Sequence, residues 1–261
     1  MTSQKVVPPT WRHPMALFLS TAAPLYATLL ARRHLDGVWA RGLDDLRAQL
    51  AKGPVILAPN HVGWFDGQLV LVLHRVLGVE GRFLVKADNV EKMSYLRLMG
   101  GIPIDPTSTS GSLAAMEEAA AWLDGPGKLL WIFPQGRFRP ASMRPLELQR
   151  GVELLHRISK AVVVPVGSVS GWRDLHLPAW ALSFGAPVSG RDKLLPRLES
   201  AIVAEIDTLE RWFDQPASVD GVVAIVPSVV WPYEKGLGSR FYLLCADIFR
   251  AIAKAVRRVT G

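Results

Sequence analysis

Residues 54–77 read PVILAPNHVGWFDGQLVLVLHRVL, and this stretch decides the fold. It begins with a short apolar run, Pro54–Ala58, whose length and composition predict a buried strand. It ends with Gln68–Leu77, which predicts a helix. A buried strand followed closely by a helix is the repeating unit of α/β proteins.

The same alternation continues along the chain. Further strands are predicted at 82–85, 102–104, 129–133 and 161–166, and helices at 91–99, 112–123, 150–159 and 191–213, the last interrupted near Pro196. Strands that alternate with helices favour a largely parallel sheet covered on both faces. We therefore predict a single α/β domain with a mostly parallel mixed sheet flanked by helices. Residues 221–232 are compatible with a final strand or with membrane contact.

Composition agrees with one globular domain between two distinctive ends. The chain has 261 residues, 49% hydrophobic and 20% charged, which excludes an intrinsically disordered protein. Cys245 is alone, which excludes a disulfide scaffold. The net charge of +7 divides unevenly, because residues 1–50 carry +3, residues 235–261 carry +5 and the stretch between them carries −1. Nucleic-acid enzymes usually spread basic residues along a binding face, so we expect no nucleic-acid partner.

Both ends suggest membrane lipids as partners. Met15–Ala31 lacks charge, is bracketed by basic residues and has Pro24 in its middle. We expect a kinked, partly inserted membrane-associating helix or helix pair there, with a single span or a buried core helix as alternatives. Residues 240–261 combine helical apolar periodicity with basic residues, which suits a membrane surface or a docked outer helix. The predicted organisation is a membrane-associating segment (1–40), a central domain (41–235) and a basic amphipathic helix (236–261), peripheral or monotopic at the cytoplasmic face of the cell membrane.

Several common catalytic signatures are absent from the sequence. The segment nearest to a Gly-x-Ser-x-Gly elbow, 167–171, has Val169 at the serine position. There is no Walker loop and no His-Glu-x-x-His, and a single cysteine makes no zinc site. Simple hydrolase, nucleotide-binding and zinc-enzyme interpretations are thereby disfavoured, and we expect neither a metal nor a bound cofactor.

The segment between the first strand and its helix carries the chemistry. His61 is followed five residues later by Asp66, a spacing that none of the other five histidines has to an acidic residue. A neutral imidazole can take a proton from a hydroxyl near pH 7. A carboxylate on its other ring nitrogen fixes the tautomer and stabilises the imidazolium that forms. The pair alone is a weak signal, because a histidine at a strand end is more often structural.

Downstream segments complete a pattern around this pair. In order they are Lys86 after the second strand, a Gly-x-Ile-x-Ile-Asp-like block ending at Asp105, a Phe-Pro-x-Gly block over Phe133–Arg139, and Val-Pro-Val at 164–166. With Asn60, His61 and Asp66 as Asn-His-x4-Asp, this order resembles the glycerolipid and lysophospholipid O-acyltransferase family, which includes 1-acylglycerol-3-phosphate acyltransferases. The resemblance covers roughly residues 50–170.

The resemblance implies direct acyl transfer by the central domain. His61 would deprotonate an acceptor hydroxyl, Asp66 would orient and charge the imidazole, and the oxygen would attack an acyl thioester of coenzyme A (acyl-CoA) or acyl carrier protein (acyl-ACP) as co-substrate. Lys86 or backbone N–H groups near Gly136 are candidate oxyanion donors. The remaining residues expected to bind the acceptor or hold the motifs together are Asn60, Lys86, Asp105, Phe133, Pro134, Gln135, Gly136, Arg137, Arg139 and Arg150.

The acceptor motifs depart from the family pattern. Pro106 stands where the family has arginine, Gln135 replaces the glutamate of Phe-Pro-Glu-Gly-Thr-Arg, and Phe138 occupies its arginine position. The base rate of the family favours a lysophospholipid-type acceptor such as lysophosphatidate, with Arg137, Arg139, Arg144 and Arg150 offering guanidinium groups to a phosphate. The alternatives are an acceptor without glycerol phosphate, such as a glycolipid or glycosylated carotenoid, a non-catalytic lipid-binding protein on this fold, and a lipid hydrolase that activates water with the same base.

Overall fold

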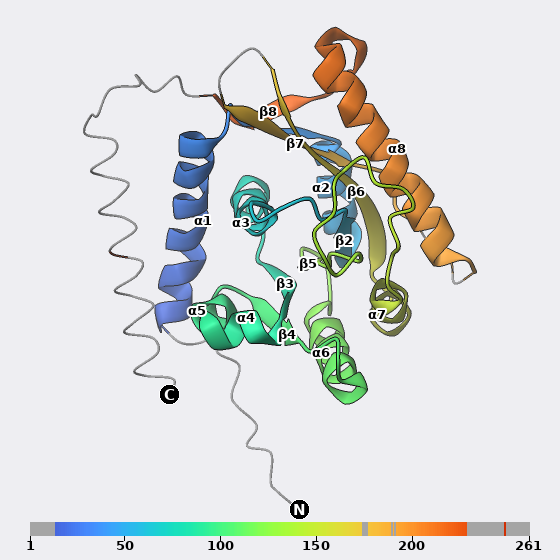
Figure 1. Ribbon diagram of the computed structural model, residues 1–261. Helices are drawn as coiled ribbons and strands as arrows, with labels where there is room; N and C mark the ends of the chain where they lie inside the picture. Colours follow the sequence, from blue (N-terminus) through green and yellow to red (C-terminus); the bar gives the residue numbers. More distant parts are fainter. Residues whose placement is uncertain (1–13, 174–176, 189, 191, 229–247, 249–261) are drawn as a thin grey trace, which may run out of the picture.

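One sheet of eight strands organises the molecule (Figure 1). The computed structural model describes residues 14–173, 177–188, 190, 192–228 and 248. In chain order the strands are β1 (Val38–Arg41), β2 (Val55–Pro59), β3 (Gly81–Lys86), β4 (Gly101–Ile104), β5 (Leu129–Trp131), β6 (Val162–Trp172), β7 (Pro178–Phe184) and β8 (Val223–Val226). Their order across the sheet is β4-β3-β5-β2-β6-β7-β1-β8.

The sheet is mostly parallel, as predicted. Strands β4, β3, β5, β2 and β6 pair in parallel, and β7 pairs in parallel with β1. The β6–β7 and β1–β8 pairs are antiparallel. The carboxyl ends of the five parallel neighbours therefore meet at one edge, which is where ligands bind in open α/β sheets.

Helices cover both faces of this sheet (Figure 1). They are α1 (Pro14–His34), α2 (Leu43–Lys52), α3 (Asp66–Leu77), α4 (Ala87–Lys92), α5 (Tyr95–Leu98), α6 (Thr109–Trp122), α7 (Gly151–Ser159) and α8 (Leu194–Asp214), with a 3-10 turn η2 (Pro216–Ser218). Buried residues of α1, α2 and α3 form the core on one face, and those of α6, α7 and α8 form it on the other. Strand β2 lies between the two cores, since Val55 and Leu57 join the first and Ile56 and Ala58 the second.

The N-terminal apolar run differs from its prediction. Helix α1 is continuous through Pro24, and its C-terminal half packs on α3, with Ala27 and Ala31 fully buried. The expected membrane-associating helix or helix pair is therefore not supported, because these small side chains are used for close packing within the domain. Among the described residues, no helix has the length and apolar character needed to cross a bilayer.

Several element boundaries also differ from prediction. The helix expected at 91–99 is two short helices, α4 and α5, on either side of Met93 and Ser94. Helix α8 is not interrupted near Pro196, because this residue lies in the first turn, where a helix needs no amide hydrogen bond. Strand β6 extends to Trp172 and forms a hairpin with β7, which the sequence pattern did not identify.

The predictions for the last two segments of the chain, 221–232 and 236–261, have different outcomes. Within the described part of 221–232, strand β8 occupies Val223–Val226 at the sheet edge, which agrees with the predicted final strand. The basic helix expected over 236–261 lies outside the described residues, apart from position 248.

Candidate active site

His61 and Asp66 form a direct hydrogen-bonded pair. His61 Nδ1 lies 2.7 Å from Asp66 Oδ2, and the same oxygen accepts the backbone N–H groups of Val62 at 2.9 Å and Gly63 at 3.0 Å. Three donors converging on one oxygen suit a carboxylate, so Nδ1 carries the hydrogen and Nε2 keeps its lone pair. The Asp66 side chain is 2% exposed and that of His61 is 20% exposed. The His61 imidazole is therefore accessible to solvent, whereas the Asp66 carboxylate is buried.

The fold places this pair at the carboxyl edge of the sheet. Strand β2 ends at Pro59 and α3 begins at Asp66, so the six residues between them form the connecting loop. Asp66 is the first residue of α3, where the helix dipole favours negative charge. The loop is short enough for the histidine near its start to reach the carboxylate at its end.

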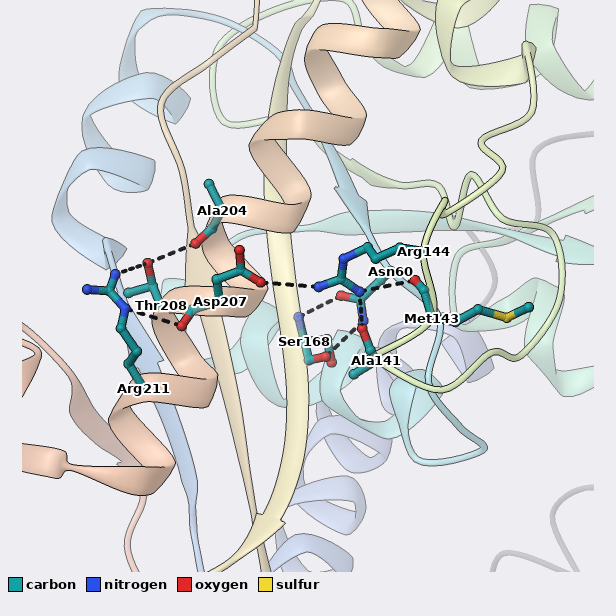
Figure 2. A network of polar contacts seen from close by, with 9 residues as sticks. All are labelled: Asn60, Ala141, Met143, Arg144, Ser168, Ala204, Asp207, Thr208 and Arg211. Carbon is teal, nitrogen blue, oxygen red and sulfur yellow. Dashed lines mark hydrogen bonds and ion pairs between the residues drawn. The ribbon is translucent and has the colours of Figure 1, made fainter.

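Asn60 fixes the start of the loop to the neighbouring strand. Its amide donates to the Ser168 carbonyl at 2.9 Å and accepts the Ser168 N–H at 2.7 Å (Figure 2). The Ser168 hydroxyl accepts the indole N–H of Trp180 at 2.9 Å. Asn60 is 1% exposed, so it anchors the loop and does not face an acceptor. No sequence signal identified Ser168 or Trp180, because they are distant along the chain and meet Asn60 only through the order of the strands.

Gln135 fixes the backbone of His61 from the other side. Its Oε1 accepts the His61 N–H at 2.7 Å, and its Nε2 donates to the Leu146 carbonyl at 3.2 Å. The N–H of Arg139 donates to the His61 carbonyl at 2.8 Å. Gln135 is buried, and its two contacts require one acceptor and one donor. An ionised glutamate would supply acceptors only, which gives a structural reason for the amide at this position.

Two aromatic rings contact the imidazole of His61. The ring centroids of Phe133 and Phe138 lie 4.2 Å and 4.4 Å from that of His61. Phe138 is 58% exposed, so it forms the outer rim of the site. Pro134 is buried behind the rim, and Gly136 makes a turn with φ 65 whose N–H bonds the Phe133 carbonyl. The Phe-Pro-x-Gly block thus supports the imidazole with its side chains as well as its backbone.

The arginines of the motif are paired with acidic residues. Arg137 donates to Glu147 at 2.9 Å, and the buried Arg139 contacts the same carboxylate oxygen. Arg144 lies 3.2 Å from Asp207 of α8 (Figure 2). Arg150 is exposed at the start of α7. Glu147 and Asp207 belong to no recognisable motif, so no sequence signal points to them.

Lys86 and Asp105 lie on the same edge but further along the sheet. Lys86 ends β3, which is separated from β2 by β5, about 10 Å at the usual strand spacing. Asp105 follows β4 and accepts the N–H and hydroxyl of Thr107 at 2.9 Å and 2.6 Å. The hydrogen bond from the Thr107 hydroxyl, and next the one from the Thr107 N–H, lower the pKa of Asp105. Asp105 therefore stabilises the turn before α6, and the structure shows no contact between it and His61.

A second histidine on α3 is structural. His74 accepts the indole N–H of Trp131 at 3.1 Å, and burial lowers its pKa to about 4. It is therefore neutral near pH 7 and sealed in the core. Within the described part of the chain, no group of three or more His, Cys, Asp or Glu side chains is placed to hold a metal ion.

Comparison with known proteins identifies the family. The family model described as Acyltransferase matches residues 38–169, about half of the chain, and this range contains the His61–Asp66 pair and the block around Gln135. A search of curated proteins finds no match. This family is that of the glycerolipid acyltransferases, such as the 1-acylglycerol-3-phosphate acyltransferases. The chain belongs to this family and is an acyltransferase.

Proposed function

We propose that this enzyme moves a fatty acyl group from an acyl thioester, on coenzyme A or acyl carrier protein, to a hydroxyl of a lipid acceptor, with His61 as the base. The observation that carries the proposal is the 2.7 Å contact between His61 Nδ1 and Asp66. This contact leaves Nε2 as the nitrogen that can accept a proton. Partial exposure of the imidazole gives the hydroxyl access to it.

The proposed reaction is a direct displacement. The acceptor oxygen forms a bond to the thioester carbonyl carbon while its proton passes to His61 Nε2. The tetrahedral intermediate then breaks its carbon–sulfur bond, and the thiolate leaves with the proton returned by His61. Asp66 stabilises the imidazolium between these steps.

Backbone N–H groups beside Phe138 are the best candidates to stabilise the oxyanion. The Gly136 N–H is already used by the Phe133 carbonyl. The N–H groups of Arg137 and Phe138 donate to no other described residue, and they follow directly in the turn that packs on His61. Lys86 lies two strands away, so we favour these backbone donors.

The test is acyl transfer from labelled acyl-CoA to a panel of lipid acceptors, with thiol release measured in the same samples. We expect acylated lipid from the wild type and a loss of at least about 100-fold in His61→Gln. His34→Gln, at the exposed end of α1, is the matched control. Equal thiol release by wild type and His61→Gln would exclude this mechanism. Free fatty acid without acylated lipid would identify a hydrolase instead.

We further propose peripheral attachment to anionic membrane at the cytoplasmic face. The support is the charge of the two ends, +3 over residues 1–50 and +5 over residues 235–261. Full-length protein should sediment with vesicles that contain anionic lipid and should be released at high salt. Binding that is equal on neutral vesicles and insensitive to salt would contradict this attachment. Deletion of 1–34 is unsuitable as a test, because α1 contributes to the core.

A further inference from the structure

Two guanidinium groups beside the catalytic histidine share one carboxylate. Arg137 Nη2 lies 2.9 Å from Glu147 Oε2, and Arg139 Nη2 contacts the same oxygen. The cluster is attached to the catalytic loop, because the Arg139 N–H donates to the His61 carbonyl at 2.8 Å. The guanidinium groups of the two arginines in this motif therefore already have an anion.

The loop that carries Glu147 is firmly anchored. The preceding residue, Leu146, is fully buried. Its N–H donates to Glu199 at 2.6 Å, and its carbonyl accepts a hydrogen bond from the Gln135 side-chain amide at 3.2 Å. Glu147 itself has φ 56, a left-handed conformation that is uncommon for residues other than glycine. Of the three such residues in the described chain, Lys160 and Lys193 are helix caps, whereas Glu147 is not. The anchored Leu146 thus holds Glu147 in this unfavourable backbone conformation, and the half-exposed Glu147 carboxylate lies at the two arginines.

This arrangement is unsuited to a phosphate next to the reacting hydroxyl. Paired guanidinium groups bind phosphate well when they are free, but here a phosphate would have to displace Glu147 or lie beside its negative charge. Arg139 is 6% exposed and cannot turn outward to meet a ligand. Phe138 adds an apolar ring over the imidazole, 4.4 Å between centroids.

We propose that Glu147 is a specificity-determining residue that excludes phosphate-bearing acceptors. The acceptor is then a lipid alcohol with no phosphate or other anionic group beside its reacting hydroxyl, either a neutral glyceride or a neutral sugar-bearing lipid. This inference rests on the proposed acyl transfer by His61 and narrows its substrate class. The rings of Phe133 and Phe138 suit an uncharged acceptor, because they offer apolar faces beside the base.

The experiment compares acceptors that differ in the phosphate. Full-length enzyme is given labelled acyl-CoA with monoacylglycerol, with an alkyl glucoside or with lysophosphatidate of the same chain length. The measured quantity is the ratio of kcat/KM for the better uncharged acceptor to that for lysophosphatidate. The variants are Glu147→Gln, which keeps the shape and removes the charge, and Glu117→Gln, an exposed glutamate of α6 that makes no ion pair with the described residues.

We expect the wild-type ratio to exceed about 10, and Glu147→Gln to lower it at least about tenfold through a lower KM for lysophosphatidate. Glu117→Gln should keep the wild-type ratio. Preference of the wild type for lysophosphatidate, or an unchanged ratio in a folded Glu147→Gln, overturns the inference but leaves the proposed function standing. Absence of His61-dependent transfer to all three acceptors overturns both. If Glu147→Gln does not fold, the wild-type ratio decides alone.

Discussion

Two histidines, one just before the start of helix α3 and one near its end, lie in opposite environments. At the N-terminal end of the helix, His61 meets the carboxylate of Asp66 and stays partly open to solvent. Near its C-terminal end, His74 accepts a hydrogen bond from Trp131 in the core. Trp131, the last residue of β5, contacts His74, and Phe133, two residues further along the chain, contacts His61. The same side chain is thus made a base or a core residue by its neighbours.

His61 and His74 differ in only a few properties of their surroundings. Both imidazole rings have aromatic neighbours and one polar side-chain partner. The decisive differences are the charge of that partner and access to water. Asp66 stabilises an imidazolium, whereas the indole N–H of Trp131 needs a neutral acceptor and burial opposes the charged form.

The largest expected effect is at the N-terminal end of α3. We predict that Asp66→Asn lowers kcat about 10²–10⁴-fold, because the near-isosteric amide keeps the shape but cannot stabilise the imidazolium. Labelled acyl transfer by the purified variant provides the measurement, with its melting temperature as the check on folding. A folded variant within threefold of wild type would mean that His61 acts without its carboxylate.

The next effect is at the C-terminal end. The folded-state pKa of His74 is about 4, against 6.5 for the free side chain. Between these values the unfolded chain binds the proton and the folded chain does not, so acidification from pH 6.5 to 4 should cost about 3 kcal/mol of unfolding free energy. Above pH 6.5 this contribution to the pH dependence is absent.

Urea unfolding of wild type and His74→Gln across this range measures that contribution. The variant should lose less stability on acidification, because glutamine accepts from Trp131 without titrating. Parallel curves for the two proteins would show that His74 is protonated in the folded state.

A smaller effect is expected at the support of His61. Gln135→Glu should lower the unfolding free energy by about 1–3 kcal/mol near pH 8, since an ionised carboxylate cannot donate to the buried Leu146 carbonyl. The loss should shrink at lower pH, where a protonated carboxyl can donate. Gln149→Glu, at an exposed position, is the matched control. Similar losses of unfolding free energy in both variants would show that the Gln135 amide has no special role in stability.

The smallest effect is expected where polar partners are exposed. Arg144 and Asp207 form an ion pair at 3.2 Å with side chains 32% and 57% exposed (Figure 2). Arg144→Gln should therefore change the unfolding free energy by less than about 1 kcal/mol. Denaturant unfolding is again the measurement. A loss of unfolding free energy above about 2 kcal/mol would show that this exposed ion pair contributes to stability as the buried contacts do.

Much of the fold followed from local patterns. Short apolar runs such as Pro54–Ala58 identified the central strands, because a strand buried on both faces needs apolar residues throughout. The β6–β7 hairpin was missed because its partners are recognised only by pairing. Helix α1 was assigned to the membrane because an apolar helix packed on a core and one embedded in lipid have similar compositions.

The candidate site likewise has one part that the sequence pattern predicts and another that depends on tertiary contacts. Asn-His-x4-Asp was recognisable because His61 and Asp66 are only five residues apart, at the two ends of one short connection between β2 and α3. The partners of the motif arginines were not recognisable. Glu147 reaches them only because its loop is anchored through Leu146, and Asp207 comes from α8.

The sequence alone therefore determined the alternating architecture and the family, and it singled out His61 and Asp66 as the proposed base and its carboxylate. These depend on short-range patterns, which survive without knowledge of contacts. Only the tertiary structure decided which charges are free, which histidine is sealed and whether α1 belongs to the core. Those properties depend on neighbours from distant segments, because burial by such neighbours disfavours the charged form of a titratable side chain.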